Sequence, residues 1–424
     1  MASPSDLATP MLAVAVITAT AQLFGTLAQR CHQPRVVGEI VGGIVLGPSL
    51  LGVLAPALES QLFSAPVRSQ LNLLGQLGLV LFMFLVGLEL NLGLLRSRLP
   101  LASRITTAGL VLPLSLGVAL AGLFEIWLPE LLPGHRLLSG ALFMGTAMAI
   151  TAFPVLARIL RDRGLHNQPL GALAITTAAI DDALGWILLA AVVALARSAS
   201  AWGALGSLLG TAAWALVVLV GTRPLRNLLE QHYKRGRDLG PLLQSALFSG
   251  ALLSAVVTEW LGVHLIFGAF LWGLAMPRYG PFRRRLELQL ETVVLRLLLP
   301  LFFAISGLST RIGSLNTPSL WLALLVVLVV AISGKFLGTW AVARLSGVES
   351  REAQALGWLM NTRGLTELVI LNVGLAQGVI STELFTIGVL MALVTTVMTG
   401  PLLGRLGYGI VQRPVAGAAL RAEP

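Results

Sequence analysis

Two adjacent aspartates, Asp181 and Asp182, lie in the middle of an apolar stretch, residues 170–196, that is longer than a bilayer requires. The whole chain contains only five aspartates. A charge at mid-bilayer costs about 2.5–3.5 kcal/mol on insertion scales, so such residues are rare and mark ion or proton paths. A buried carboxylic acid can hold a proton or exchange it for a desolvated Na⁺ or K⁺. A structural pair, neutralised by protonation and hydrogen-bonded, is the alternative.

Further charges lie within apolar segments: Arg296, Lys335, Arg363 and Glu367. Lys335 is too deep for its ammonium group to reach the membrane surface. A buried lysine needs a carboxylate partner or loses its proton, so one of the two aspartates is the expected partner. Lys335 could also neutralise a helix C-terminus, and the two roles are compatible. Arg363 and Glu367, four residues apart, would pair on a continuous helix or offset opposing helix ends at a break.

The composition identifies a polytopic membrane protein. The chain is 56% hydrophobic and 11% charged, with a mean hydropathy of +0.86. Its net charge of +10 comes from basic residues in short loops between apolar runs, which indicates membrane orientation rather than binding to nucleic acid. The single cysteine, Cys31, excludes an internal disulfide.

The hydropathy pattern predicts thirteen transmembrane helices, at roughly residues 7–28, 36–54, 70–91, 101–124, 137–161, 168–196, 202–221, 241–259, 263–276, 288–309, 319–344, 351–376 and 382–403. With this count, 21 basic residues fall on one side of the membrane and four on the other. The four are Arg68, Arg136, Arg197 and Arg311. The positive-inside rule therefore predicts an outside N-terminus and a cytoplasmic C-terminus.

The longest basic loop, residues 222–240, divides the chain into six helices, one connecting helix and six more. An offset of seven spans makes the two halves inverted repeats. The fifth helix of each half is interrupted: one contains Pro154, and the other contains Gly364 between two charges. Pro154 alone could produce a simple kink. Interrupted helices in corresponding positions instead predict two broken helices around a binding site near the bilayer midplane.

Several motifs, in order and at these spacings, resemble the monovalent cation:proton antiporter-2 family, which includes Kef-type potassium/proton and plant cation/proton exchangers. They are QPRVVGEIVGGIVLGPSLLG, ITAFPVLARIL, IDDALGWILLA, GKFLG and MNTRGLTELVILNVGLAQGVI, and the match extends over most of residues 7–404. The resemblance implies crossed broken helices beside the acidic sixth helix. It also implies that Asp182 coordinates the ion, that Lys335 pairs with Asp181, and that a Thr151 oxygen could ligate the cation.

The resemblance further implies a homodimer in which residues 1–404 form the transmembrane antiporter domain. A moving core would comprise residues 101–196 and 319–404, and a static dimerisation part residues 7–91 and 241–309, with helix 202–221 as the connector. Kef-type proteins usually add a cytoplasmic nucleotide-binding domain, whereas here we expect only a short cytoplasmic tail, residues 405–424. We expect the bacterial inner membrane as the location and no cofactor beyond the transported ions.

Other functions fit the residues less well. A channel would need an open pore, whereas inverted halves with a closed midplane site are typical of alternating access. An intramembrane aspartyl protease needs two carboxylates facing each other across a water molecule, and adjacent residues on one helix diverge by about 100°. Motifs of common soluble enzymes are missing from the sequence. A second acid with a lysine could allow more than one proton per cation.

Overall fold

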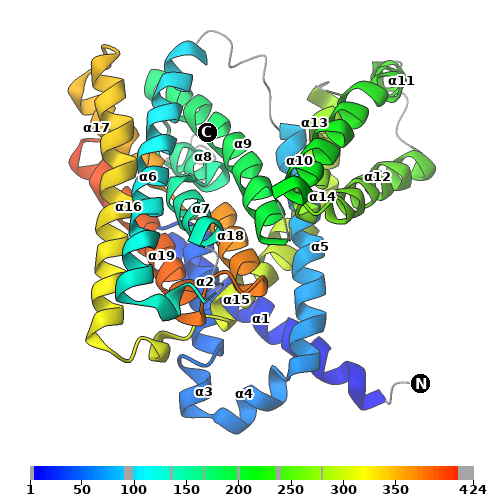
Figure 1. Ribbon diagram of the computed structural model, residues 1–424. Coiled ribbons are helices and arrows are strands. Elements are labelled where there is room, and N and C mark those ends of the chain that lie inside the picture. Colours follow the sequence, from blue (N-terminus) through cyan, green and yellow to red (C-terminus); the bar gives the residue numbers. More distant parts are fainter. Residues whose placement is uncertain are drawn as a thin grey trace, which may run out of the picture.

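The computed structural model describes residues 4–89, 99–133, 137–165, 168–197, 201–234, 240–277 and 280–408. Throughout these ranges the regular structure is helical and contains no strand (Figure 1). This confirms the all-α expectation. Arg136 and the residues after 408, the greater part of the expected tail, lie outside the described residues.

The first half of the chain contains α1 (Pro4–Arg30), α2 (Arg35–Leu46), α3 (Leu51–Leu54), α4 (Pro56–Leu62), α5 (Ala65–Glu89), α6 (Leu99–Trp127), η1 (Pro129–Leu131), α7 (Leu137–Ala149), α8 (Phe153–Asp162) and α9 (Pro169–Arg197). The second half contains α10 (Ala201–Leu216), η2 (Val217–Gly221), α11 (Arg223–Lys234), α12 (Pro241–Trp260), α13 (Leu265–Ala275), α14 (Gly280–Val293), η3 (Val294–Leu298), α15 (Leu299–Leu308), η4 (Ile312–Ser314), α16 (Pro318–Leu345), α17 (Ser350–Met360), α18 (Leu365–Ala376) and α19 (Thr382–Arg405).

Ten helices within the described ranges are long and apolar enough to cross a membrane. Three shorter apolar helices accompany them: Leu138–Ala149, Leu265–Ala275 and Thr366–Ala376. Their positions follow the predicted apolar segments closely, because continuous apolar runs bounded by charges are a strong signal for membrane helices. The chain is therefore a multi-pass integral membrane protein.

Two boundaries differ from the sequence-based expectation. The second predicted segment, residues 36–54, is divided, since α2 ends at Leu46 and α3 begins at Leu51. Pro48 explains the division, because the residue before a proline avoids the helical conformation. The basic segment 222–240, expected to be a loop, is largely the helix α11. Most of its residues are strong helix formers, and a polar helix outside the apolar run leaves no hydropathy signal.

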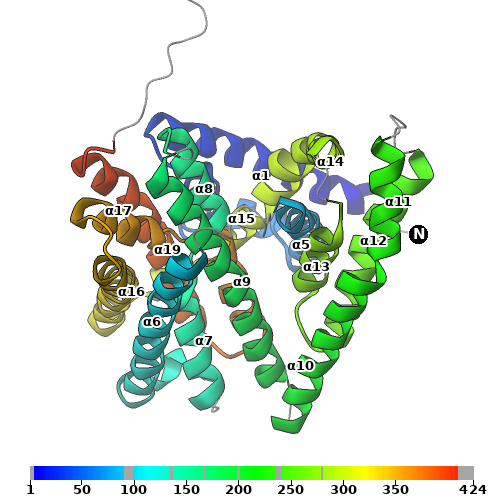
Figure 2. The same cartoon turned by 90° about the horizontal axis from the view of Figure 1, so that it is seen from above.

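The helices form two groups; Figure 2 shows α6, α7, α16, α17 and α19 towards one side of the molecule and α5, α12, α13 and α14 towards the other. In one group α1 packs on α2, α5 packs on α13, and α15 packs on both α2 and α5. In the other group α6 packs on α7, α9 and α16, while α16 also packs on α17 and α19. The broken helices and the two aspartates belong to the second group.

Close helix packing accounts for the glycine-rich motif in α2. A Cβ atom on Gly38 would lie 2.1 Å from the Phe24 carbonyl oxygen of α1, and one on Gly43 would lie 2.2 Å from the Ala304 carbonyl oxygen of α15. Side chains larger than hydrogen would force both helix pairs apart. The glycines of the motif are therefore a packing device in the first group of helices.

Candidate ion-binding site at the crossing of two broken helices

Both predicted helix breaks are present, and they face each other. Helix α7 ends at Ala149 and α8 begins at Phe153, while α17 ends at Met360 and α18 begins at Leu365. The first interruption therefore precedes Pro154, which is the second residue of α8. Proline is tolerated there because the first turn of a helix has no partner for its N–H groups.

Hydrogen bonds join the two interruptions. The Ala152 amide donates to the Thr362 carbonyl at 2.9 Å, and the Thr151 hydroxyl donates to the Met360 carbonyl at 2.8 Å. Gly364 permits this close approach, because a Cβ atom on it would lie 2.8 Å from Cγ2 of Val155. Each broken helix thus satisfies backbone groups that the other leaves open, as unwound backbone at membrane depth requires.

Both carboxylate oxygens of Asp181 accept hydrogen bonds. It is completely buried, and the Lys335 ammonium lies 3.0 Å from both of its oxygens. The Thr151 amide donates to Oδ2 at 2.7 Å. Lys335 also donates to the Ala149 carbonyl at the end of α7. The expected lysine–aspartate ion pair is therefore present, and Lys335 also neutralises a helix C-terminus.

Arg363 completes the capping of α7. Its guanidinium donates to the carbonyls of Ala147 at 2.6 Å and Met148 at 2.7 Å, and to Glu367 Oε2 at 2.8 Å. Arg363 and Glu367 are each 1% exposed. Glu367 lies in the first turn of α18, where a negative charge opposes the helix dipole. Both expected roles, the pair and the offsetting of helix ends, occur together.

Asp182 lies on another face of α9 and has weaker partners. It is 5% exposed, its Oδ1 accepts a hydrogen bond from the Thr366 hydroxyl at 3.0 Å, and its Oδ2 accepts one from the Trp186 indole at 3.3 Å. Both donors are neutral, and the described residues include no ion pair to Asp182. This carboxylate therefore has no counter-charge to displace when a cation arrives.

The sequence reasoning missed Thr366 and Trp186. Trp186 is four residues after Asp182, so helical periodicity alone places it on the same face. Thr366 could be found only once the broken helix α18 is placed against α9. Arg296 stands apart from this cluster, since it lies exposed in η3 of the other helix group.

The described residues offer no group of three or more His, Cys, Asp or Glu side chains that could hold a metal ion. Carboxylate and hydroxyl oxygens, the atoms gathered here, are hard ligands that suit alkali cations rather than transition metals. The arrangement can bind a proton or a monovalent cation at one buried carboxylate.

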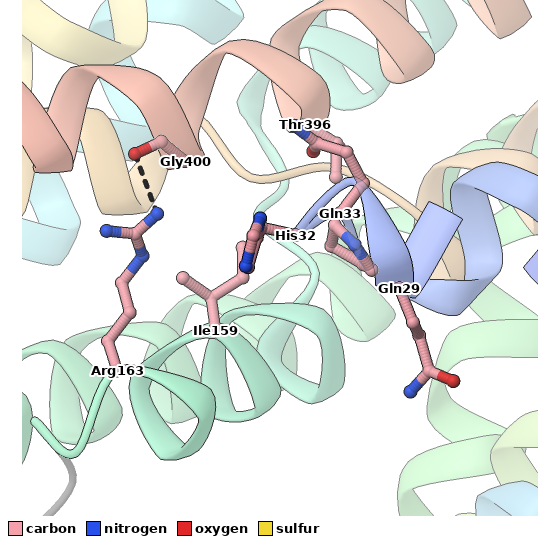
Figure 3. Close-up of a pocket in the computed structure, with 8 residues that line it drawn as sticks. Gln29, His32, Gln33, Ile159, Arg163, Thr396 and Gly400 are labelled. Carbon is pink, nitrogen blue, oxygen red and sulfur yellow. Dashed lines mark hydrogen bonds between the residues drawn. The ribbon is translucent and has the colours of Figure 1, made fainter. Parts of the chain in front are cut away.

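A cavity of about 230 Å³ opens between the two helix groups (Figure 3). Gln29, His32 and Gln33 line it from the junction of α1 and α2, Ile159 and Arg163 from the end of α8, and Thr396 and Gly400 from α19. Arg163 donates to the Gly400 carbonyl at 2.8 Å, which ties α8 to α19.

Thr396 connects this cavity with the helix crossing. Its hydroxyl accepts a hydrogen bond from the Arg363 amide at 3.0 Å and donates one to the Arg363 carbonyl at 2.6 Å. The same side chain therefore lines the cavity and touches the interruption between α17 and α18.

Residues 14–407 match the family described as "Sodium/hydrogen exchanger, transmembrane". The chain belongs to this sodium/hydrogen exchanger family. It is 44% identical to the Na(+)/H(+) antiporter NhaS4 of Synechocystis, over 93% of this chain and 96% of that protein. It is 39% identical to Cation/H(+) antiporter 20 of Arabidopsis thaliana, over 94% of this chain and 49% of that protein. The resemblance to cation:proton antiporters in the sequence motifs is thereby confirmed.

A third relative is the K(+)/H(+) antiporter 1 of Saccharomyces cerevisiae, 34% identical over 88% of this chain and 43% of that protein. The chain thus spans about half the length of the plant and yeast relatives. Among solved structures, the sodium proton antiporter MjNhaP1 of Methanocaldococcus jannaschii matches with a TM-score of 0.68 over 96% of this chain and all of that chain. At 14% identity this likeness shows a shared exchanger fold.

Proposed function

We propose that this exchanger carries Na⁺ or K⁺ against H⁺ by alternating access, and that Asp182 binds cation and proton in competition. The observation that carries the proposal is the contrast at α9. Asp181 already has a counter-ion, whereas Asp182 is buried with two neutral donors only. A site that binds either ion, but not both, couples their movements without a cofactor.

The surrounding residues have supporting roles in this proposal. Thr151 lies in the interruption of α7 and α8, where its hydroxyl or backbone oxygen contributes to cation coordination. Lys335 and Arg363 hold the negative end of α7, and Glu367 offsets the positive end of α18. Pro154 and Gly364 keep the two interruptions open. Together they fix the backbone around Asp182 before any ion arrives, which lowers the cost of binding.

The membrane topology that we propose has thirteen spans in two inverted halves, with the N-terminus outside and the C-terminus in the cytoplasm. Ten long apolar helices and three shorter ones support this count, and the unequal distribution of basic residues supports the orientation. We place the protein in the bacterial inner membrane. A cyanobacterial relative that matches nearly end to end is consistent with that membrane.

The two helix groups correspond to the two parts of the mechanism. The group around α6, α9, α16 and α19 carries the ion and moves, while the group around α1, α2, α5, α13 and α15 stays fixed and forms a homodimer. The cavity lined by His32 and Thr396 lies between these groups, on the side where most basic residues lie. It supports a route from the cytoplasm towards the crossing.

Exchange in proteoliposomes tests the proposal. A pH gradient is imposed, Li⁺, Na⁺, K⁺ or Rb⁺ is added in turn, and proton movement is followed with the membrane potential clamped. We expect proton efflux driven by Na⁺ or K⁺ that saturates with cation concentration and needs no other solute. Cation flux that continues unchanged without any proton movement would overturn the proposal in favour of a channel.

A further inference from the structure

The buried Thr366 donates its hydroxyl hydrogen to a carboxylate on another helix. Buried helical threonines such as Thr177 and Thr395 donate the hydroxyl hydrogen to the carbonyl four residues earlier, at 2.8 Å in both cases. Thr366 is the second residue of α18, where no such helical carbonyl precedes it. Its hydroxyl reaches across to Asp182 of α9 instead.

The Thr362 carbonyl, four residues before Thr366, is occupied by the Ala152 amide at the helix crossing. The carbonyl to which a helical threonine would donate therefore lies in the interruption, and the Thr366 hydroxyl donates to the carboxylate. Thr366 is 1% exposed, so water does not compete freely for this hydroxyl. The Thr366 hydroxyl therefore acts on the Asp182 carboxylate and does not stabilise α18.

The two side chains on Asp182 differ in what they can bind. An indole N–H only donates, so Trp186 can orient the carboxylate but cannot ligate a cation. A hydroxyl donates one hydrogen and also accepts through two lone pairs, and it rotates without moving any heavy atom. Thr366 can therefore donate to Asp182 when no cation is bound and offer its oxygen to a cation when one is bound.

We propose that Thr366 is a selectivity-determining ligand of the transported alkali cation. In the cation-free site its hydroxyl donates to Asp182 Oδ1, and when a cation binds, the hydroxyl turns so that its oxygen faces the ion beside that carboxylate. This inference rests on the proposed role of Asp182. Glu367, in the same turn of α18 and paired with Arg363, opposes the positive end of that helix.

The role of Thr366 as a ligand can be tested by comparing alkali cations of different size. Ion–oxygen attraction grows as the separation falls, so a smaller ion gains more from each coordinating oxygen. Loss of the Thr366 oxygen should raise the KM for Na⁺ about tenfold, the magnitude expected when a charged partner loses one hydrogen-bonding group. The increase should be larger for Li⁺ and smaller for Rb⁺, while the maximal rate changes little.

A residue that only orients the carboxylate gives a different pattern. Every ion shares Asp182, so poorer orientation changes the KM for all ions by one common factor. The experiment therefore measures KM and maximal rate for Li⁺, Na⁺, K⁺ and Rb⁺ in proteoliposomes containing Thr366→Val, Thr366→Ala or Thr366→Ser. Thr366→Ser retains the hydroxyl and should restore the wild-type order of ions.

The matched control is Thr395→Val, which removes a buried hydroxyl that is bonded within its own helix. It should leave the KM values of all four ions unchanged. Thr366→Ala adds no bulk, so it keeps the test possible if Thr366→Val folds poorly, and thermal unfolding in detergent checks both variants. An unchanged KM, or an equal factor for all ions, overturns the proposal.

Asp182→Asn, measured with the same ions, distinguishes failure of the proposed function from failure of the proposed role of Thr366. If Asp182→Asn still exchanges normally, the proposed function itself fails. If Asp182→Asn is inactive while Thr366→Val shows no ion-dependent change, Asp182 remains the exchange site and only the role of Thr366 is lost.

Discussion

Asp181 and Asp182 are neighbours on one helix, yet their surroundings differ in kind. Asp181 is held by a lysine and a backbone amide, with both oxygens engaged. Asp182 accepts two hydrogen bonds from neutral side chains, one of them 3.3 Å long. Because adjacent residues on a helix point about 100° apart, one carboxylate faces the lysine of α16 and the other the broken helix α18.

The difference between the two carboxylates suggests that one contributes to stability and the other to transport. A buried carboxylate that is paired and hydrogen-bonded is costly to disturb, so Asp181 belongs to the framework that holds the crossing together. A buried carboxylate with neutral donors only can change its ion without leaving a charge uncompensated. The same division of labour predicts that the two aspartates respond very differently to the same substitution.

The largest effect on transport is expected at Asp182. Asp182→Asn should reduce cation/proton exchange to the level of liposomes without protein, because an amide cannot trade a proton for a cation. Proteoliposome flux and thermal unfolding are measured together, and the fold should remain intact. The matched control is the double variant Asp181→Asn with Lys335→Gln, which neutralises the other site as a pair and should retain exchange. Near-normal exchange by Asp182→Asn would reverse the assignment.

The largest effect on stability is expected at the ion pair. Lys335→Ala should destabilise the protein by about 3–5 kcal/mol, because it leaves Asp181 buried without its counter-ion. The α7 carbonyl that Lys335 caps is also left open. Lys335→Gln also removes the counter-ion and should destabilise the protein. Adding Asp181→Asn to it should recover part of that stability, with a coupling energy of about 0.5–3 kcal/mol.

Unfolding in detergent, measured for the two single variants and the double variant, completes this cycle. Additive effects of Asp181→Asn and Lys335→Gln would mean that the two side chains do not stabilise each other. Lys335 would then act only as the cap of α7.

A smaller effect on transport is expected at Thr151, whose amide donates to Asp181 and whose hydroxyl donates to the Met360 carbonyl. Thr151→Val removes a hydroxyl at nearly constant volume, and the apparent KM for the cation should rise about two- to tenfold with little loss of maximal rate. The cation dependence of exchange is the measurement. If the KM stays at its wild-type value, Thr151 contributes its backbone oxygen alone, or nothing.

The smallest effect is expected at Trp186. Trp186→Phe replaces the indole by a smaller aromatic ring and removes a long hydrogen bond to Asp182, so the KM should rise by only about twofold, and equally for Na⁺, K⁺ and Rb⁺. Exchange assays with the three ions provide the check. A factor that differs between ions would show that Trp186 shapes the cation site itself and would weaken the distinction between an orienting donor and a ligand.

Much of this arrangement could be predicted from the sequence, because charges are scarce in the apolar segments. Lys335 is so deep that it needed a carboxylate, and α9 supplied the two candidates. The residues alone did not decide between Asp181 and Asp182, since that choice depends on the rotation of α9 against α16. The family resemblance indicated Asp181, which is the residue that the structure brings to Lys335.

Other parts of the site could not be predicted for identifiable physical reasons. The first interruption precedes Pro154 because the proline lies in the first turn of α8 rather than at the end of α7. Thr366 looks like an ordinary residue in an apolar helix, and only the crossing places it against α9. Helix α11 was missed because a polar helix beyond an apolar run leaves no trace in a hydropathy pattern.

The most direct test of the account is the proton released when cation is added to the purified protein. In weakly buffered detergent solution, a pH indicator follows the addition of Na⁺ or K⁺. We expect saturable proton release from the wild type and from the double variant Asp181→Asn with Lys335→Gln, and none from Asp182→Asn. Proton release that persists in Asp182→Asn and disappears in the double variant would contradict the account, because the exchange would then belong to Asp181.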